Sequence, residues 1–252
     1  MLGGRFVIPG RSVDAHVAFT DRRGGFSEGP FSSFNLARHV GDVDSAVTAN
    51  RAALGSVLGL QADRLSFTSQ VHGTRVHMVD LDSSSASVPA TVVEADAQVT
   101  GEERVGLVVM VADCTPVVLA DPDAGLVAVA HAGRRGMADG VVGAVLEAME
   151  RRGATRVSAI VGPSICGRCY EVPDELRHEV AALHPVAGAI TWSGTPALDV
   201  SAGVVSQLAD RGVRIVHWDR SCTFEDPDLF SYRRDGATGR FAGIGWLAPH
   251  PD

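Results

Sequence analysis

Three side chains in this sequence could together bind a metal ion: His72, Cys114 and His131. Two imidazoles and a thiolate are ligands that zinc prefers, and three protein ligands leave the fourth tetrahedral position open, as in catalytic zinc sites. The three residues come from separate segments and form no short C-x-x-C or H-x-x-H pair. Their spacing alone is therefore weak evidence for a metal site, and it favours a buried Cys114 that packs as a small apolar residue and histidines that only form hydrogen bonds.

Copper is an alternative ion for the same residues, because two histidines and one cysteine also form the equatorial ligands of a blue-copper centre. A multicopper oxidase must in addition reduce dioxygen at a trinuclear cluster built from several His-x-His pairs. The nine histidines of the chain contain no such pair. The sequence therefore disfavours a complete laccase.

Cys114 could instead act as a nucleophile, with His131 as its base and Asp113 or Asp96 orienting the imidazole. A thiolate that attacks and a thiolate that binds a metal both require partial exposure and a lowered pKa. The residue types alone do not separate these roles. Glu94 and Asp96, just before a strand-like segment, could also supply a general base, although loop carboxylates are most often simply exposed.

The stretch His131-Ala-Gly-Arg-Arg-Gly-Met follows a predicted strand and precedes a predicted helix. A helix N-terminus offers unpaired N–H groups and partial positive charge, so Arg134, Arg135 and these groups could bind phosphate. The alternative is a glycine turn with two solvated arginines. All 22 basic residues are arginine. The absence of lysine excludes Schiff-base chemistry, pyridoxal phosphate attachment and a P-loop lysine.

A second short motif, Cys166-Gly-Arg-Cys169, has the spacing of a redox or zinc site. We expect no functional disulfide there, because the sequence has no second C-x-x-C and no thioredoxin-like context. The chain has four cysteines in 252 residues, too few for a disulfide scaffold. This usage predicts a reducing, cytoplasmic setting.

Composition excludes two further classes of function. A net charge of −8 and a pI near 5.5 argue against a nucleic-acid-binding protein. Asp113 and Asp121 interrupt the longest apolar stretch, so we expect no membrane span, and the N-terminal segment lacks the layout of a signal peptide.

The elements that must position the candidate residues can be read from apolar patterning. Runs rich in valine and isoleucine predict strands at Ala15–Thr20, Leu65–Ser69, Val76–Val79, Val105–Ala112, Val117–Ala120, Leu126–Ala130, Arg156–Val161 and Arg214–Trp218. Helices are predicted from an Asp44 cap through Leu58, over Met137–Arg151, from Asp174 to before Pro185, and over about Ser201–Arg211. Mixed strands and helices without strict alternation predict an α/β (α+β) fold, with residues 1–252 as a single domain of mixed β-sheets flanked by helices.

The turn chemistry of Asp121-Pro-Asp-Ala-Gly125 predicts that the strands on either side pair antiparallel. If Cys114-Thr-Pro116 also bends the chain, Val105–Ala112 and Leu126–Ala130 run the same way and Cys114 and His131 emerge at one edge of the sheet. If residues 105–120 instead form one long strand, the two side chains meet only across a hairpin.

Eight segments taken in order resemble one known family across nearly the whole chain. They are FTDRRGGFSEGPFSSFNLARHVGD, NRAAL, SQVHGTRV, EADAQVT, VADCTPVVLAD, AVAHAGRRG, VGPSICGRCYEV and FSYRRDGATGRFAGIGWL. This set resembles the purine nucleoside phosphorylase family with a laccase domain, long labelled multicopper polyphenol oxidoreductase. The resemblance implies a single-domain fold, a zinc ion bound by His72, Cys114 and His131, phosphorolysis of adenosine, inosine, guanosine and methylthioadenosine, and adenosine deamination.

The resemblance also implies roles for individual residues. Cys114, His131 and Asp96 are expected to be catalytic, with Asp96 moving protons during deamination. Arg51, Arg135 and the helix N-terminus are expected to bind phosphate, and Asn35 to contact the nucleoside. The chain departs from the family where it reads His-Ala-Gly-Arg-Arg-Gly, because Arg134 occupies an aromatic position.

Two other functions remain open at this stage. One is a cysteine or zinc hydrolase of amides that edits peptidoglycan precursors, and the other is a copper oxidase of phenols. The expected partners are small-molecule purine nucleosides and phosphate, with neither nucleic acid nor membrane. The sequence does not predict the preferred nucleoside or the oligomeric state.

Overall fold

The centre of the molecule is a hairpin of two completely buried strands, β7 (Thr115–Asp121) and β8 (Leu126–Ala132). They pair antiparallel, with Val117 opposite Ala130, and the predicted turn connects them through Gly125 at a φ of 65°. Along β7 and β8 the larger apolar side chains alternate between two faces. Val118 and Val129 face a second sheet, whereas Val117 and Ala130 face helices. Burial on both faces explains why residues 116–120 and 126–130 are apolar throughout.

The structure is a computed structural model that describes residues 1–81, 87–88 and 92–250. The described residues form three sheets, and their strand orders are β1-β2-β13-β6-β3, β12-β9-β7-β8-β5-β4 and β10-β11. The five-stranded sheet contains β1 (Leu2–Ile8), β2 (Val13–Thr20), β13 (Phe241–Pro249), β6 (Gly106–Val111) and β3 (Leu65–Phe67). Joining the hairpin in the six-stranded sheet are β12 (Arg214–Trp218), β9 (Ser158–Val161), β5 (Ala97–Thr100) and β4 (Val76–Met78). The short pair is β10 (Gly188–Ile190) and β11 (Pro196–Leu198).

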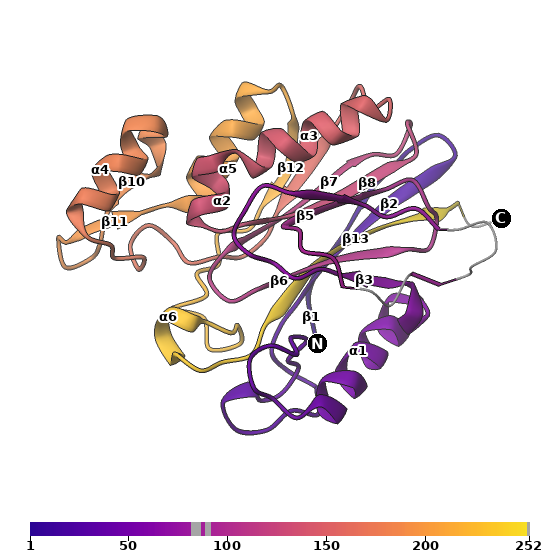
Figure 1. Cartoon of the computed structure of the whole chain (residues 1–252), viewed down its shortest axis with the longest axis horizontal. Coiled ribbons are helices and arrows are strands. Elements are labelled where there is room, and N and C mark those ends of the chain that lie inside the picture. Colours follow the sequence, from indigo (N-terminus) through magenta and orange to yellow (C-terminus); the bar gives the residue numbers. More distant parts are fainter. Residues whose placement is uncertain (82–86, 89–91, 251–252) are drawn as a thin grey trace.

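Helices cover the outer faces of the two large sheets, giving four layers (Figure 1). Helix α1 (Asp44–Leu58) packs Leu54 and Leu58 against the five-stranded sheet. On the other side, α3 (Val141–Arg151) and α5 (Val200–Asp210) cover the six-stranded sheet. The two sheets enclose a separate apolar layer between them. The other described α-helices are short or peripheral: α2 (Arg134–Asp139), α4 (Asp174–Leu183) and α6 (Tyr232–Asp235).

This architecture confirms the predicted α/β fold of mixed sheets flanked by helices. The segment predicted as one helix over Met137–Arg151 is helical and ends at Arg151 as expected, but Gly140 adopts a φ of 95° and divides it into α2 and α3. Asp44 was also expected to cap its helix. It is instead the first helical residue, after Val43, and its carboxylate pairs with Arg38.

Strand β13 was missed because its sequence, FAGIGWLAP, does not have the side-chain pattern of a strand. The glycines are required by the close approach of the two sheets. A Cβ on Gly245 would lie 2.7 Å from Val118 Cγ1 and 2.9 Å from Val127 Cγ2. Within the described ranges, each helix is too short or too polar to cross a lipid bilayer.

Candidate active site

A sharp bend between the two large sheets positions Cys114. Strand β6 ends at Val111 in one sheet and β7 begins at Thr115 in the other, and Asp113 between them has a φ of 97°. Because β7 and β8 are antiparallel with Pro116 opposite His131, Cys114 and His131 lie at the same end of the hairpin. The chain therefore bends before Pro116, and residues 105–120 do not form one long strand.

Asp113 holds this bend and does not orient a histidine. Its carboxylate accepts hydrogen bonds from Thr223 Oγ1 and Ser231 Oγ, each at 2.6 Å, and from the N–H of Arg233 at 2.7 Å. These bonds connect the bend to the segment that leads into α6. A positive φ costs energy in a residue other than glycine, and the three bonds compensate for that cost.

Asp96, immediately before β5, connects the other two candidate ligands. Its Oδ1 accepts from His131 Nδ1 at 2.8 Å and from the N–H of His72 at 2.9 Å, and its Oδ2 accepts from the N–H of Gly73 at 2.7 Å. The side chain of Asp96 is completely buried. Since His131 uses Nδ1 for Asp96, its Nε2 is left to face the site.

We call His72, Cys114 and His131 the metal triad. Their ligand atoms all lie within 4.8 Å of one another, and Cys114 Sγ is 3.7 Å from His72 Nε2. Tetrahedral zinc, with bonds of about 2.1 Å to nitrogen and about 2.3 Å to sulfur, separates such atoms by roughly 3.6 Å. The triad therefore fits a zinc ion. Gly133 makes room for it, because a Cβ there would lie 2.5 Å from His72 Cδ2.

The electrostatics of the triad favour a thiolate. Burial raises the pKa of the Cys114 thiol, but the charge and hydrogen bond of His131 outweigh it and lower that pKa to about 6. Burial lowers the pKa of His131, but the Cys114 thiolate and Asp96 outweigh it and raise that pKa to about 9. Burial likewise opposes ionisation of Asp96, yet hydrogen bonds from His131 and the backbone hold its pKa below the usual value. A thiolate is the form that binds zinc.

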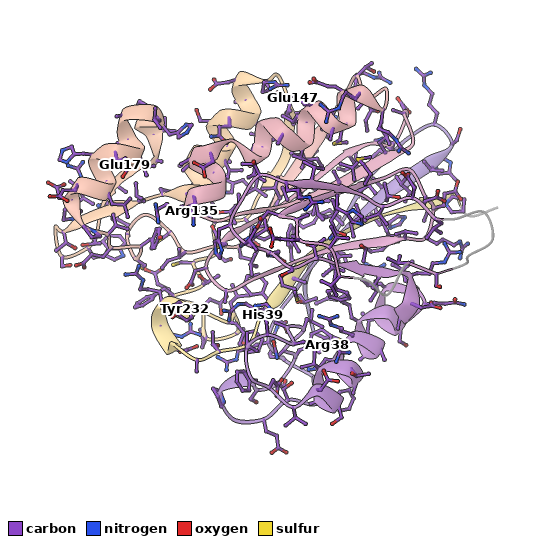
Figure 2. The ribbon with its side chains drawn as sticks, viewed as in Figure 1. Arg38, His39, Arg135, Glu147, Glu179 and Tyr232 are labelled. Carbon is purple, nitrogen blue, oxygen red and sulfur yellow. The ribbon has the colours of Figure 1, made fainter. Side chains whose placement is uncertain are left out.

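The metal triad lies in the wall of a cavity of about 570 Å³. Three arginines, Arg134, Arg233 and Arg240, line the same cavity, and we call them the cavity arginines. The remaining lining residues are His39, Gln70, Met110, Val111, Ala112, Asp113, Ile165, Tyr170, Val200 and Tyr232. In Figure 2 the labelled Tyr232 on α6 and His39 lie on the lower side of this region, and Arg135 lies on the opposite side near α2.

The predicted substrate-binding residues Asn35, Arg51 and Arg135 are not in the cavity wall. Asn35 is fully buried, and its amide oxygen accepts from the N–H groups of Ala37 and Arg240. Arg51 lies behind the wall, with its guanidinium 3.6 Å from the centre of the Phe67 ring. Arg135 is exposed on α2.

Arg134, the departure from the family pattern, is the arginine of this pair that faces the cavity. Sequence reasoning did not single out Arg233, Arg240, Tyr170 or Tyr232. The segment FSYRRDGATGR, which contributes to the family resemblance, contains three of these four residues and is the signal that could have identified them.

Comparison with known proteins agrees with this picture. Residues 16–248 match the family described as multi-copper polyphenol oxidoreductase laccase. A purine nucleoside phosphorylase of Streptomyces coelicolor is 49% identical over 98% of this chain and 100% of its own, and one of Streptomyces griseus is 50% identical over 92% and 94%. The crystal structure of YlmD from Geobacillus stearothermophilus matches with a TM-score of 0.82 at 32% identity, covering 95% of this chain and 97% of that one.

Proposed function

This chain belongs to the multi-copper polyphenol oxidoreductase laccase family, and we propose that it is a zinc-dependent purine nucleoside phosphorylase that also deaminates adenosine. The proposed substrates are adenosine, inosine, guanosine and methylthioadenosine, together with phosphate. One observation carries the proposal: the metal triad and the cavity arginines line a single cavity of about 570 Å³. Metal ligands beside several cations suit a reaction between a nucleoside and an anion.

Zinc bound by the metal triad would supply Lewis-acid chemistry, which acidifies a water molecule or polarises a substrate oxygen. The protein's own contribution begins with Asp96, which holds His131 through Nδ1 and fixes the ring so that Nε2 faces Cys114. Because Asp96 is buried and its oxygens are occupied by N–H donors, we assign it a positioning role. This replaces the proton transfer expected from the sequence.

The cavity arginines are the groups that would bind phosphate. Arg240 forms no ion pair with a carboxylate in the described part of the chain, and its guanidinium donates only to the carbonyls of Thr238 and Gly239. Arg134 also has no carboxylate partner there. Guanidinium groups bind phosphate oxygens through two parallel N–H bonds. Arg135, exposed on the same helix as Arg134, is proposed as a further contact at the rim.

Two tyrosines supply surfaces for the purine ring. The guanidinium of Arg233 lies 5.0 Å from the centre of the Tyr170 ring, and that of Arg240 lies 5.9 Å from the centre of Tyr232. Met110 and Ile165 add apolar surface to the cavity. The aromatic and apolar wall would contact the flat purine base, and the neighbouring cations would contact the phosphate that reacts with the nucleoside.

In phosphorolysis a phosphate oxygen bonds to the anomeric carbon of ribose while the bond from that carbon to the purine nitrogen breaks. The proton carried by the hydrogen phosphate ends on the purine nitrogen, and the sugar retains the phosphate. The cavity arginines would hold the attacking phosphate next to the ribose. The two reactants would then react within one bound complex, which lowers the entropic part of the barrier. Their positive charge also offsets the charge of the phosphate as it approaches.

The test is chromatography of purified enzyme with each nucleoside, with and without phosphate. We expect free purine and an equimolar ribose phosphate only when phosphate is present, and inosine from adenosine when phosphate is omitted. His72→Ala should remove both reactions, whereas His178→Ala, which changes an exposed histidine on α4, should keep them. Purine release that does not depend on phosphate would overturn the phosphorylase assignment.

A second candidate function is favoured by one observation. Asp96, His131 and Cys114 form a chain in which a carboxylate orients an imidazole beside a thiolate, as in cysteine hydrolases. This arrangement would suit hydrolysis of an amide, such as a peptidoglycan precursor, without a metal. Full activity after removal of zinc, together with its loss on alkylation of Cys114, would favour this hydrolase over the phosphorylase.

A copper phenol oxidase has less support. Of the metal-capable groups that the described residues form, none contains more than two histidines, whereas a trinuclear copper cluster needs several His-x-His pairs. Metal analysis of protein purified without added metal would distinguish the two ions.

A further inference from the structure

A second group of potential metal ligands lies where two neighbouring loops meet. One loop follows β9 and contains Cys166 and Cys169, and the other follows β12 and contains Cys222 and Glu225. Strands β9 and β12 are adjacent and parallel, so both loops leave the same edge of the sheet. A bridge between Ser164 and Cys222 continues this pairing into the loops.

Each loop forms a tight turn that directs its two ligands to the same side. The N–H of Cys169 donates to the carbonyl of Cys166 at 3.0 Å, and the N–H of Glu225 donates to that of Cys222 at 3.1 Å. In such a turn the first and fourth side chains lie close together, which is why zinc sites so often use the C-x-x-C spacing. The sequence contains no second C-x-x-C. The structure pairs Cys166-Gly-Arg-Cys169 with Cys222-Thr-Phe-Glu225 instead.

The two turns bring their ligand atoms together. The Sγ atoms of the three cysteines and a carboxylate oxygen of Glu225 all lie within 4.8 Å of one another. The N–H of Cys166 also points at Cys222 Sγ, at 3.4 Å. Backbone N–H groups directed at sulfur stabilise a thiolate, the form of cysteine that binds zinc.

We propose that Cys166, Cys169, Cys222 and Glu225 bind a second zinc ion that has a structural role. Three thiolates select zinc over magnesium or calcium, which prefer oxygen ligands. Four protein ligands would fill the tetrahedral sphere and leave no position for substrate, as in structural sites.

Surrounding contacts hold the ligands in place. Trp192 Nε1 donates to Glu225 Oε1 at 3.2 Å, which orients the carboxylate from outside the group. Arg234 donates to the carbonyls of Thr223 at 2.8 Å and Asp226 at 2.9 Å, so it fixes the second turn and places positive charge beside an anionic site. Gly167 is required in the first turn because a Cβ there would lie 2.8 Å from Asp199 Cβ.

A disulfide explains these contacts less well. Any disulfide would use two of the three sulfurs and leave the third outside the bond, and a disulfide through Cys169 would also remove the contact of its Sγ with Glu225 Oε1 at 3.3 Å. A disulfide would also give no reason for the contact of Trp192 Nε1 with Glu225 Oε1 at 3.2 Å. All four groups have a role if a cation lies between them.

The second zinc ion would brace one wall of the active-site cavity. Ile165 precedes Cys166 and Tyr170 follows Cys169, and both residues line the cavity. Thr223, next to Cys222, donates to Asp113, which holds the bend at Cys114. Loss of this ion should therefore loosen the wall without removing any ligand of the metal triad.

The test isolates the second ion in a chain that lacks Cys114. Cys114→Ala protein, purified without chelator, should retain about one zinc per chain by mass spectrometry. Adding Cys169→Ser or Glu225→Gln should lower its zinc content or affinity, and the matched control Asp226→Asn, which changes a neighbouring carboxylate outside the group, should not. Replacement of the ion by cobalt should give strong thiolate-to-cobalt absorption and the visible bands of a tetrahedral site.

Two outcomes would overturn the proposal. The first is Cys114→Ala protein that carries no zinc and shows no thiolate–cobalt band. The second is a thiol titration of that protein, denatured with chelator and without reductant, which finds a single thiol and so reveals a disulfide. Both measurements use chains with the group intact, so they decide the question even if the added substitutions prevent folding.

Discussion

Asp96→Asn is the substitution that tests the proposed metal centre most directly, because Asp96 touches His131 and the backbone of His72 without being a ligand itself. Its Oδ1 accepts from the His131 ring, and its Oδ2 accepts from the N–H groups of Gly73 and Val71. An asparagine has only one oxygen, so its NH₂ group must face one of these two sets of donors. Neither orientation preserves the site.

If the NH₂ group faces His131, the ring must accept at Nδ1 and carry its proton on Nε2, where it can no longer bind zinc. If the NH₂ group faces Gly73, two N–H donors of the His72 loop lose their acceptor, which costs about 1–3 kcal/mol of folding free energy. Loss of such a supporting carboxylate typically weakens metal binding about 10–100-fold. That corresponds to roughly 1.4–2.7 kcal/mol.

The assay is competition for zinc against a chromogenic chelator, together with urea unfolding of the metal-free protein. The matched control is Asp80→Asn, because Asp80 is an exposed carboxylate paired with Arg152 outside the site. We expect wild-type zinc affinity for the control and a loss of at least about tenfold for Asp96→Asn. A zinc affinity for Asp96→Asn within about twofold of the wild type would refute the argument that Asp96 fixes His131 for metal binding.

Three further predictions follow from the same geometry. Arg240→Met should raise the KM for phosphate about 10–100-fold, because it removes charge-assisted hydrogen bonds to phosphate. The control Arg151→Met, on the exposed end of α3, should leave that KM unchanged. A rise in the KM for nucleoside with an unchanged KM for phosphate would contradict the phosphate role. In metal-free protein, the rate of Cys114 alkylation should increase as the pH rises through about 6, since only the thiolate reacts, and added zinc should block the reaction. A pH midpoint of that rate near the ordinary thiol pKa of about 8.5 would contradict the lowered pKa. Gly133→Ala should sharply weaken zinc binding because its Cβ would lie 2.5 Å from His72 Cδ2, whereas Gly143→Ala on α3, where the nearest atom is 3.8 Å away, should bind zinc normally.

The parts of this molecule that local chemistry determines were predictable from the sequence. The turn at Asp121–Gly125 and the apolar runs beside it place His131 at the end of a strand, and Pro116 helps to mark the bend that positions Cys114. Which carboxylate supports His131 was not predictable. Asp113 and Asp96 were equally plausible in sequence, and only the pairing of β5 with β8 decides for Asp96.

Long-range packing explains why other features of the site and the fold could not be predicted from the sequence. The residues around Arg240 have no helical or strand periodicity. The position of Arg240 depends on Asn35, a residue far away in the sequence, whose side-chain oxygen accepts the backbone N–H of Arg240. Glu225 belongs to no recognisable motif. It joins the cysteine group only because β9 and β12 are neighbours. Gly245 looks like a strand breaker until the facing sheet is present to require it.

The charges around the cavity bear on which kind of substrate it accepts. Burial and the nearby Arg38 lower the pKa of Arg51 to about 10, and burial also lowers the pKa of Arg240. Both guanidinium groups therefore carry a positive charge that burial makes unfavourable. Burial and these two arginines lower the pKa of His39, which is therefore neutral near pH 7 and does not neutralise an anion. A dication with a single thiolate in the metal triad would add further positive charge. The Cys114 thiolate and Asp113 offset part of the charge of Arg240. A neutral phenol would add no further compensation, whereas a phosphate would, and for that reason the cavity suits phosphate better than a phenol.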